Sequence, residues 1–90
     1  MTKPKHTPGP WVVAGPDDFS RLSVESTEYY VALVDFSHAQ DANARLIAAA
    51  PDLLEALELW RDRISGPTEI SMQKLLHMTD AANAKAKGEA

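Results

Sequence analysis

The 90-residue sequence contains no cysteine. This absence excludes disulfide bonds, thiolate metal sites and a cysteine nucleophile, so the fold must depend on its hydrophobic core. The chain also lacks a long apolar run, because its most apolar region is interrupted by Asn, Arg, Asp, Glu and Pro. The basic N-terminus MTKPKHTPGPW is followed by no apolar segment, so it predicts neither a signal peptide nor a membrane anchor. We therefore expect a soluble intracellular protein.

Positive charge is scarce as well. Nine Lys and Arg residues stand against thirteen Asp and Glu residues, and the formal net charge is −4. Nonspecific affinity for nucleic acid comes from clustered Lys and Arg, so this composition disfavours a nucleic-acid-binding surface. An acidic surface favours solubility, and it would also suit a protein that docks on the basic groove of a nucleic-acid-binding partner. A chain this small forms one modest core, which homodimerisation would stabilise further.

The first part of the chain predicts a small antiparallel three-stranded β-meander over about 11–36. After an irregular lead over 1–10, the short β-rich run WVVA ends in the turn sequence GPDD. RLSVEST (21–27) alternates apolar and polar residues, as a half-buried strand does. EYYVALVDF (28–36) has a polar residue on only one face, so we expect this strand to be the most deeply buried. The short join STE predicts an antiparallel hairpin between these two strands.

A change of period after FSHAQD predicts a kinked helix pair over about 41–64. An apolar seam with spacings of four and three residues follows one helical face: Leu46, Ala50, Leu53, Leu57, Trp60 and Ile64. A proline costs little in the first turn of a helix, so we expect one helix over 41–49 and a second from Pro51 to 64. Because the seam keeps its phase across Pro51, the two helices should be roughly coaxial.

The sequence SGPT should end the second helix, and a C-terminal helix over about 67–84 should start at Pro67 or Thr68. Residues 85–90 should form a frayed tail. The whole chain, 1–90, is thus predicted to be a single α+β domain. We expect the Leu-rich helices to cover one face of the sheet and to leave an apolar stripe for another chain.

No group of residues predicts a catalytic, cofactor or metal site. The three histidines lack the spacing of a metal site. Ser37, His38 and Asp41 lie close in sequence, but such a segment at a helix start is more typical of a helix cap than of a catalytic triad. Asp17 and Asp18 fit a turn in which carboxylates bond to the local backbone. We therefore predict no enzymatic activity, no cofactor and no metal.

The most informative surface is the predicted exposed edge of the helices. Trp60 and Met72 are the expected anchors, with core packing as the alternative for each apolar residue. The predicted partner-binding residues are Glu58, Trp60, Arg61, Met72, Leu75 and Leu76.

Two motifs carry a family resemblance. HTPGPW near the N-terminus, then β-rich sequence, then ANARLIAAAPDLLEAL, resembles a widespread group of small phage and prophage proteins. The resemblance implies a bacteriophage or mobile-element origin and expression in the host bacterial cytoplasm. It implies no catalytic residues.

Three functions from different classes remain open. The preferred one is a non-enzymatic protein-binding module that blocks a host protein, such as a CRISPR-type defence nuclease. The first alternative is a structural or accessory phage protein that self-associates, with a homodimer as its simplest form. The second alternative is a small DNA-binding regulator, which the net charge disfavours.

Overall fold

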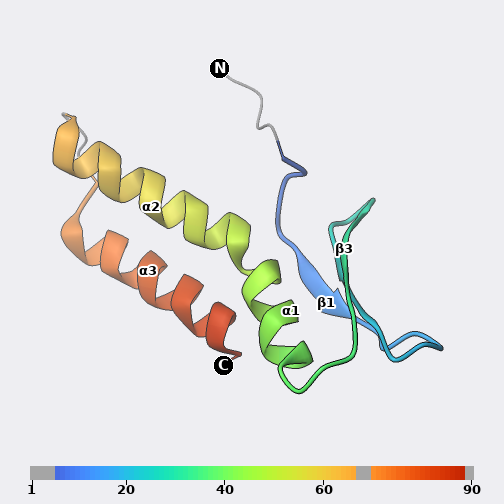
Figure 1. Cartoon of the computed structure of the whole chain (residues 1–90). Helices are drawn as coiled ribbons and strands as arrows, with labels where there is room; N and C mark the ends of the chain where they lie inside the picture. Colours follow the sequence, from blue (N-terminus) through green and yellow to red (C-terminus); the bar gives the residue numbers. More distant parts are fainter. Residues whose placement is uncertain (1–5, 67–69, 89–90) are drawn as a thin grey trace.

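In the computed structural model, a three-stranded antiparallel sheet is followed by three helices (Figure 1), and the described residues are 6–66 and 70–88. The predicted α+β class and the β-meander are confirmed. The elements, in chain order, are β1 (Val12–Ala14), β2 (Leu22–Glu25), β3 (Tyr30–Val34), α1 (Gln40–Ala48), α2 (Ala50–Ser65) and α3 (Met72–Lys87).

The sheet has the strand order β1-β2-β3, so β2 lies in the centre. Val24 of β2 is 0% exposed, and it pairs with Val13 of β1 and Ala32 of β3. The prediction that the third strand would be the most buried is therefore wrong. In a three-stranded meander the second strand has a neighbour on each side, whereas β3 is an edge strand whose apolar run faces solvent on one side.

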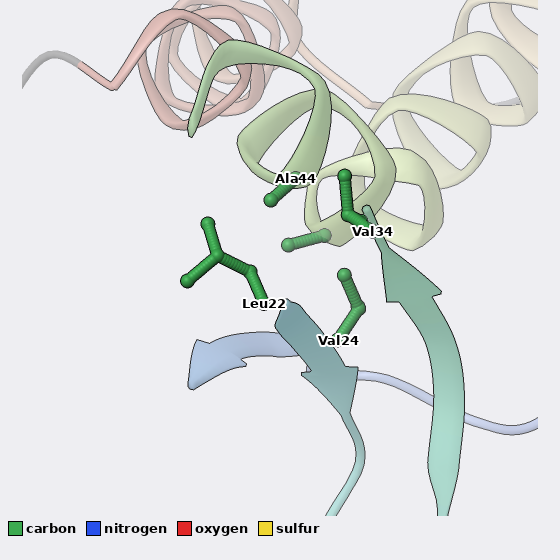
Figure 2. Close-up of a cluster of buried hydrophobic side chains, with 5 residues drawn as sticks. Leu22, Val24, Val34 and Ala44 are labelled. Atoms are coloured by element: carbon green, nitrogen blue, oxygen red, sulfur yellow. The ribbon is translucent and has the colours of Figure 1, made fainter. Parts of the chain in front are cut away.

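Helix α1 covers one face of this sheet and contacts all three strands. Its Ala44 faces Leu22, Val24 and Val34 in the core (Figure 2), and Ala48 belongs to the same buried cluster. Alanine side chains let the helix backbone approach the strands closely, since the distance between packed elements depends on the side chains at the contact. The core is therefore dense but small.

The start of α1 is tied to the sheet by one side chain. Gln40 Nε2 donates hydrogen bonds to the carbonyl oxygen of Ser20 at 2.7 Å and to that of Val34 at 3.0 Å. These carbonyl groups belong to the loop before β2 and to the end of β3. A single glutamine thus satisfies backbone acceptors of two segments and fixes where the helix begins.

Helices α2 and α3 lie side by side and project away from the sheet (Figure 1). Within the described residues they contact each other and α1 but no strand. The chain leaves the helical ladder at Ala49, and α2 starts with Pro51 in its first turn, which confirms the predicted break. The helices meet at an angle in Figure 1, so the expectation of coaxial helices, both covering the sheet, is wrong. Side-chain phase identifies one face of a helix but does not fix the direction of its axis.

The two long helices form a hairpin with a narrow interior. Ala56 of α2 and Leu75 and Ala82 of α3 are buried between the helices and α1. Two polar contacts lie beside this row of buried side chains. Trp60 Nε1 donates to Thr79 Oγ1 at 2.7 Å, and Lys85 Nζ lies 2.7 Å from an Asp52 carboxylate oxygen.

The bounds of α3 differ from the prediction. Its N-cap is Ser71, whose Oγ accepts a hydrogen bond from the backbone N–H of Lys74 at 3.1 Å. The predicted start at 67–68 lies outside the described residues. The helix continues beyond the predicted end at residue 84 and stops at Gly88, which has a φ of 76°. A glycine adopts this left-handed conformation without a steric cost, so it ends the helix.

Residues 6–10 of the N-terminal lead fold back onto the start of α2. A Cβ atom on Gly9 would lie 3.0 Å from Cβ of Pro51, which is closer than an ordinary van der Waals contact. Trp11 packs against the core cluster, and its indole N–H donates to the carbonyl oxygen of Thr7 at 3.1 Å, which satisfies this donor. The two sequence motifs HTPGPW and ANARLIAAAPDLLEAL therefore meet in space and act as parts of one packing contact.

Replacement of Leu75 by alanine tests the hairpin interior. Leu75 is 0% exposed, so Leu75→Ala should lower the free energy of unfolding by about 2–5 kcal/mol. Leu46→Ala is the matched control, because Leu46 lies on a helix but is 54% exposed. Urea denaturation followed by circular dichroism measures both. Equal losses in the two variants would contradict the burial of Leu75.

Candidate interaction surfaces

The α2–α3 hairpin carries an apolar face on one side. The bond between Trp60 and Thr79 marks this side on both helices, and residues three, four or seven positions away on a helix share the same flank. We call this surface the hairpin face. Its apolar residues are Leu53, Leu57, Trp60, Ile64, Met72 and Leu76.

The hairpin face is open to solvent. Leu57 is 67% exposed and Ile64 is 80% exposed, while Met72 and Leu76 are about half exposed. It contains most of the apolar seam that the sequence placed against the core. The prediction that these residues share one helical face is right. The expectation that this face packs on the sheet is wrong, because α2 turns away from the sheet at Ala49.

The opposite side of the hairpin carries several charged residues. The ion pair between Asp52 and Lys85 marks this flank, and Glu55 and Asp62 follow Asp52 at helical spacing. The lead from His6 to Pro10 lies along the same side and forms a shallow groove with the first turns of α2. Leu54, Leu59 and Met78 also lie on this side, so it mixes charged with apolar residues, whereas the hairpin face is mainly apolar.

The structure separates the six predicted partner-binding residues. Leu75 was predicted as accessible, and it is instead buried in the hairpin interior. Trp60 is half-buried, with its indole N–H already bonded to Thr79. Met72 and Leu76 lie on the hairpin face.

The two charged members of that set lie elsewhere on α2. Arg61 is exposed at the rim of the hairpin face, one residue beyond Trp60. Glu58 lines the groove under the N-terminal lead, away from the hairpin face. The structure thus does not gather the predicted residues into one surface.

A second candidate surface lies on the outer face of the sheet, which no described helix covers. A groove of about 550 Å³ opens there. Its floor is Ser23, which is buried, and the cross-strand partners of Ser23 and Glu25 on β3 are Leu33 and Tyr30. We call it the sheet groove. It is lined by Gly15, Pro16, Asp17, Arg21, Ser23, Glu25, Tyr30 and Leu33.

Sequence reasoning missed the sheet groove. Period-two alternation places Ser23 and Glu25 on one face of a strand, but the residues opposite them depend on the register. A shift in register at Val24 and Glu25 sets Tyr30 opposite Glu25. An irregularity of this kind re-aims side chains and leaves no signal in the hydrophobic pattern.

The floor and one end of the sheet groove are polar. Ser23 Oγ donates to a Glu25 carboxylate oxygen at 2.6 Å, which leaves the other carboxylate oxygen without a partner among the described residues. At the end formed by the β1–β2 loop, Asp17 accepts hydrogen bonds from the backbone N–H groups of Phe19 and Arg21 and from the Arg21 guanidinium. The prediction that a carboxylate in this turn bonds to local backbone is confirmed for Asp17.

These contacts lower the pKa of Asp17 below the ordinary value of 3.8. The backbone N–H of Arg21 is the largest cause, the Phe19 N–H and the Arg21 guanidinium add to it, and partial desolvation opposes it. All the favourable contacts prefer the charged carboxylate, so the loop is held in place as long as Asp17 is ionised.

The segment before α1 does not form a cap or a triad. The N-cap of α1 is Ala39, and no side chain caps the helix, so the prediction of a polar cap is wrong. Ser37, His38 and Asp41 are all exposed. In residues 6–66 and 70–88, no group of three or more His, Asp or Glu side chains could hold a metal ion. No helix in the described part of the chain is long and apolar enough to cross a membrane.

The comparison with known protein families identifies the group to which the chain belongs. The model of the family described as Salmonella phage P22 protein Y8K6 matches residues 1–90. The chain belongs to this phage protein family. Neither the curated proteins nor the solved structures contain a significant match to this family member. The phage origin implied by the resemblance is therefore confirmed.

Removal of the acceptor for Trp60 tests how the hairpin is held. Thr79→Val keeps the shape of the side chain but leaves the indole N–H unpaired, so we expect a loss of about 1–3 kcal/mol in unfolding free energy. Trp60→Phe, which removes the donor as well, is the control in a double-mutant cycle. Additive losses in the cycle would show that the bond contributes nothing.

Titration of Asp17 tests the β1–β2 loop. Its pKa, followed by the side-chain carboxyl carbon in NMR, should lie below 3.8. Because the folded pKa is depressed, the contribution of Asp17 to stability is present above pH 3.8 and is lost as the pH falls through the folded value. Arg21→Ala should raise the pKa of Asp17 only part of the way back to 3.8, since the backbone N–H of residue 21 still donates to the carboxylate. Full recovery would contradict the backbone as the main cause.

Proposed function

We propose that this phage protein is a non-enzymatic protein-binding module that acts on a host protein through the sheet groove. The observation that carries the proposal is the uncovered outer face of the sheet, where a groove combines apolar walls with a carboxylate. Concave sites with apolar walls and a few placed polar groups are typical binding sites.

The chemistry of the groove favours a basic side chain of a partner protein. Tyr30 is 76% exposed and offers a ring face, and the Glu25 carboxylate lies on the neighbouring strand directly opposite it. An arginine or lysine from a partner would meet the carboxylate and stack on the aromatic ring at once. Leu33 supplies apolar contact for the stem of such a side chain.

The charge of the whole chain supports the same class of partner. A net charge of −4 attracts basic surfaces and speeds association with them. Basic surfaces are typical of host proteins that bind nucleic acid, so a nuclease of a host defence system, including the CRISPR type, is the target class that we propose. The protein would act in the host bacterial cytoplasm.

One alternative function has an observation in its favour. The hairpin face would suit a structural or accessory phage protein that chiefly self-associates. The DNA-binding alternative has no comparable support, because two cationic side chains of the described residues, Arg21 and Lys85, are already paired with carboxylates.

Capture from host lysate with a matched pair of variants tests the proposed function. The wild-type chain should retain one host protein stoichiometrically, and Tyr30→Ala should weaken its binding by about 30-fold or more. Phe36→Ala is the control, because Phe36 has the same exposed fraction of 76% but does not line the groove. Isothermal titration with the purified partner measures both.

Two outcomes would count against this function. If the wild-type chain retains no host protein from any susceptible host, the proposal of a host target fails. If Tyr30→Ala and Phe36→Ala bind the partner equally well, the sheet groove is not the binding surface. A nuclease assay with the purified partner then decides whether binding also inhibits it.

A further inference from the structure

We propose that a second copy of this chain covers the hairpin face, so that two α2–α3 hairpins form a four-helix bundle. The proposal does not depend on the proposed function, because the sheet groove and the hairpin face are made of different elements. It explains why large apolar side chains follow one flank of both helices.

On the hairpin face the two helices have no second layer within the described part of the chain. Their buried strip is narrow and consists of Ala56, Leu75 and Ala82, which lie between the two helices and α1. The amphipathic pattern of both helices is instead that of a bundle, in which an apolar face packs against another helical layer. The thin shape fits this description, since the Cα atoms span 50 × 28 × 17 Å.

The chain exposes more surface than a compact monomer of its mass. The chain has 6928 Å² of accessible surface. A compact monomer of this mass has about 5,200 Å². The radius of gyration, 15.1 Å, also exceeds the value of about 12 Å for a compact domain of this length. The excess surface, which the hairpin face shares with the uncovered face of the sheet, is about twice the roughly 800 Å² that each partner buries in a standard interface.

Charges at the rims of the hairpin face favour a second copy over an unrelated protein. Arg61 lies at the rim on α2, and Asp80 lies at the opposite rim on α3. Each directly follows a member of the bonded pair Trp60 and Thr79, so the two charges lie at nearly the same height along the antiparallel helices. At the height of this pair, the face therefore carries opposite charges on its two rims.

This arrangement is self-complementary under one orientation of the twofold axis. A rotation about an axis parallel to the helices places α2 of one copy over α3 of the other. Arg61 of each copy then lies beside Asp80 of the other, and Ile64 lies over Leu76. A rotation about the perpendicular axis would bring Arg61 beside Arg61 and Asp80 beside Asp80, which like-charge repulsion disfavours.

The mass in solution tests the proposal directly. Sedimentation equilibrium of the full-length wild-type chain should give twice the chain mass of 9.8 kDa, with dissociation on dilution. Leu57→Lys with Ile64→Lys should raise the dissociation constant by at least about 30-fold, because they are the two most exposed apolar residues of the hairpin face. Leu46→Lys is the control for an added positive charge on an exposed helical leucine, and it should leave the dimer intact.

We expect the double variant to stay folded, because the side chains of Leu57 and Ile64 are both mostly exposed. Circular dichroism and the NMR shifts of the sheet residues check this point. A monomeric wild-type chain would overturn the proposal. A dimer that survives Leu57→Lys with Ile64→Lys would overturn it as well, because another surface must then hold the copies together.

Charge reversal tests the orientation. Arg61→Glu and Asp80→Arg should each weaken the dimer several-fold, and the two changes together should restore it, since the pair is remade in reverse. A combined variant that is weaker than either single variant would overturn the parallel axis. Capture of the host protein by a monomeric Leu57→Lys, Ile64→Lys variant separates the two proposals, because the sheet groove is intact in it.

Discussion

The close contact of α1 with the sheet is the constraint on which the rest of the structure depends. Ala44 and Ala48 bring the helix backbone onto Leu22, Val24 and Val34, and Gln40 fixes where the helix starts. In the described residues, α1 is the only helix that contacts the strands. One short helix with alanine at its contacts therefore joins two parts of very different character, a sheet and a helical hairpin. The position of each candidate surface follows from how α1 connects the sheet and the hairpin.

Local signals in the sequence predicted the elements well. Turn residues, alternation and a proline in a first helical turn identified the three strands and the break at Ala49. The partners of each face could not be predicted in the same way. Leu57 and Leu75 are both leucines on amphipathic helices, yet one is largely exposed and the other is fully buried. Periodicity tells which residues share a face, whereas the bend at Ala49 decides what that face meets.

The two candidate surfaces differ in how far the sequence revealed them. The hairpin face was visible as the apolar seam, because helical spacing survives any change in the direction of the axis. The sheet groove needed the pairing of Glu25 with Tyr30, which depends on a register shift that leaves no trace in the pattern. Membership of a phage protein family supports neither surface over the other, because the family model matches residues 1–90, which include both surfaces. Only the contacts of the described residues show which side chains form the floor of the sheet groove, which lie at the rim of the hairpin face and which are buried in the core.

The contact between Gly9 and Pro51 has a consequence for how the chain tolerates change. Each residue lies in one of the two motifs, and the missing Cβ of the glycine makes room for the proline ring. Substitutions at the two positions should therefore be energetically coupled rather than additive. The contact between Gly9 and Pro51 thus makes two segments that lie far apart in the sequence into one packing unit, so a change in the N-terminal segment should also disturb the start of α2.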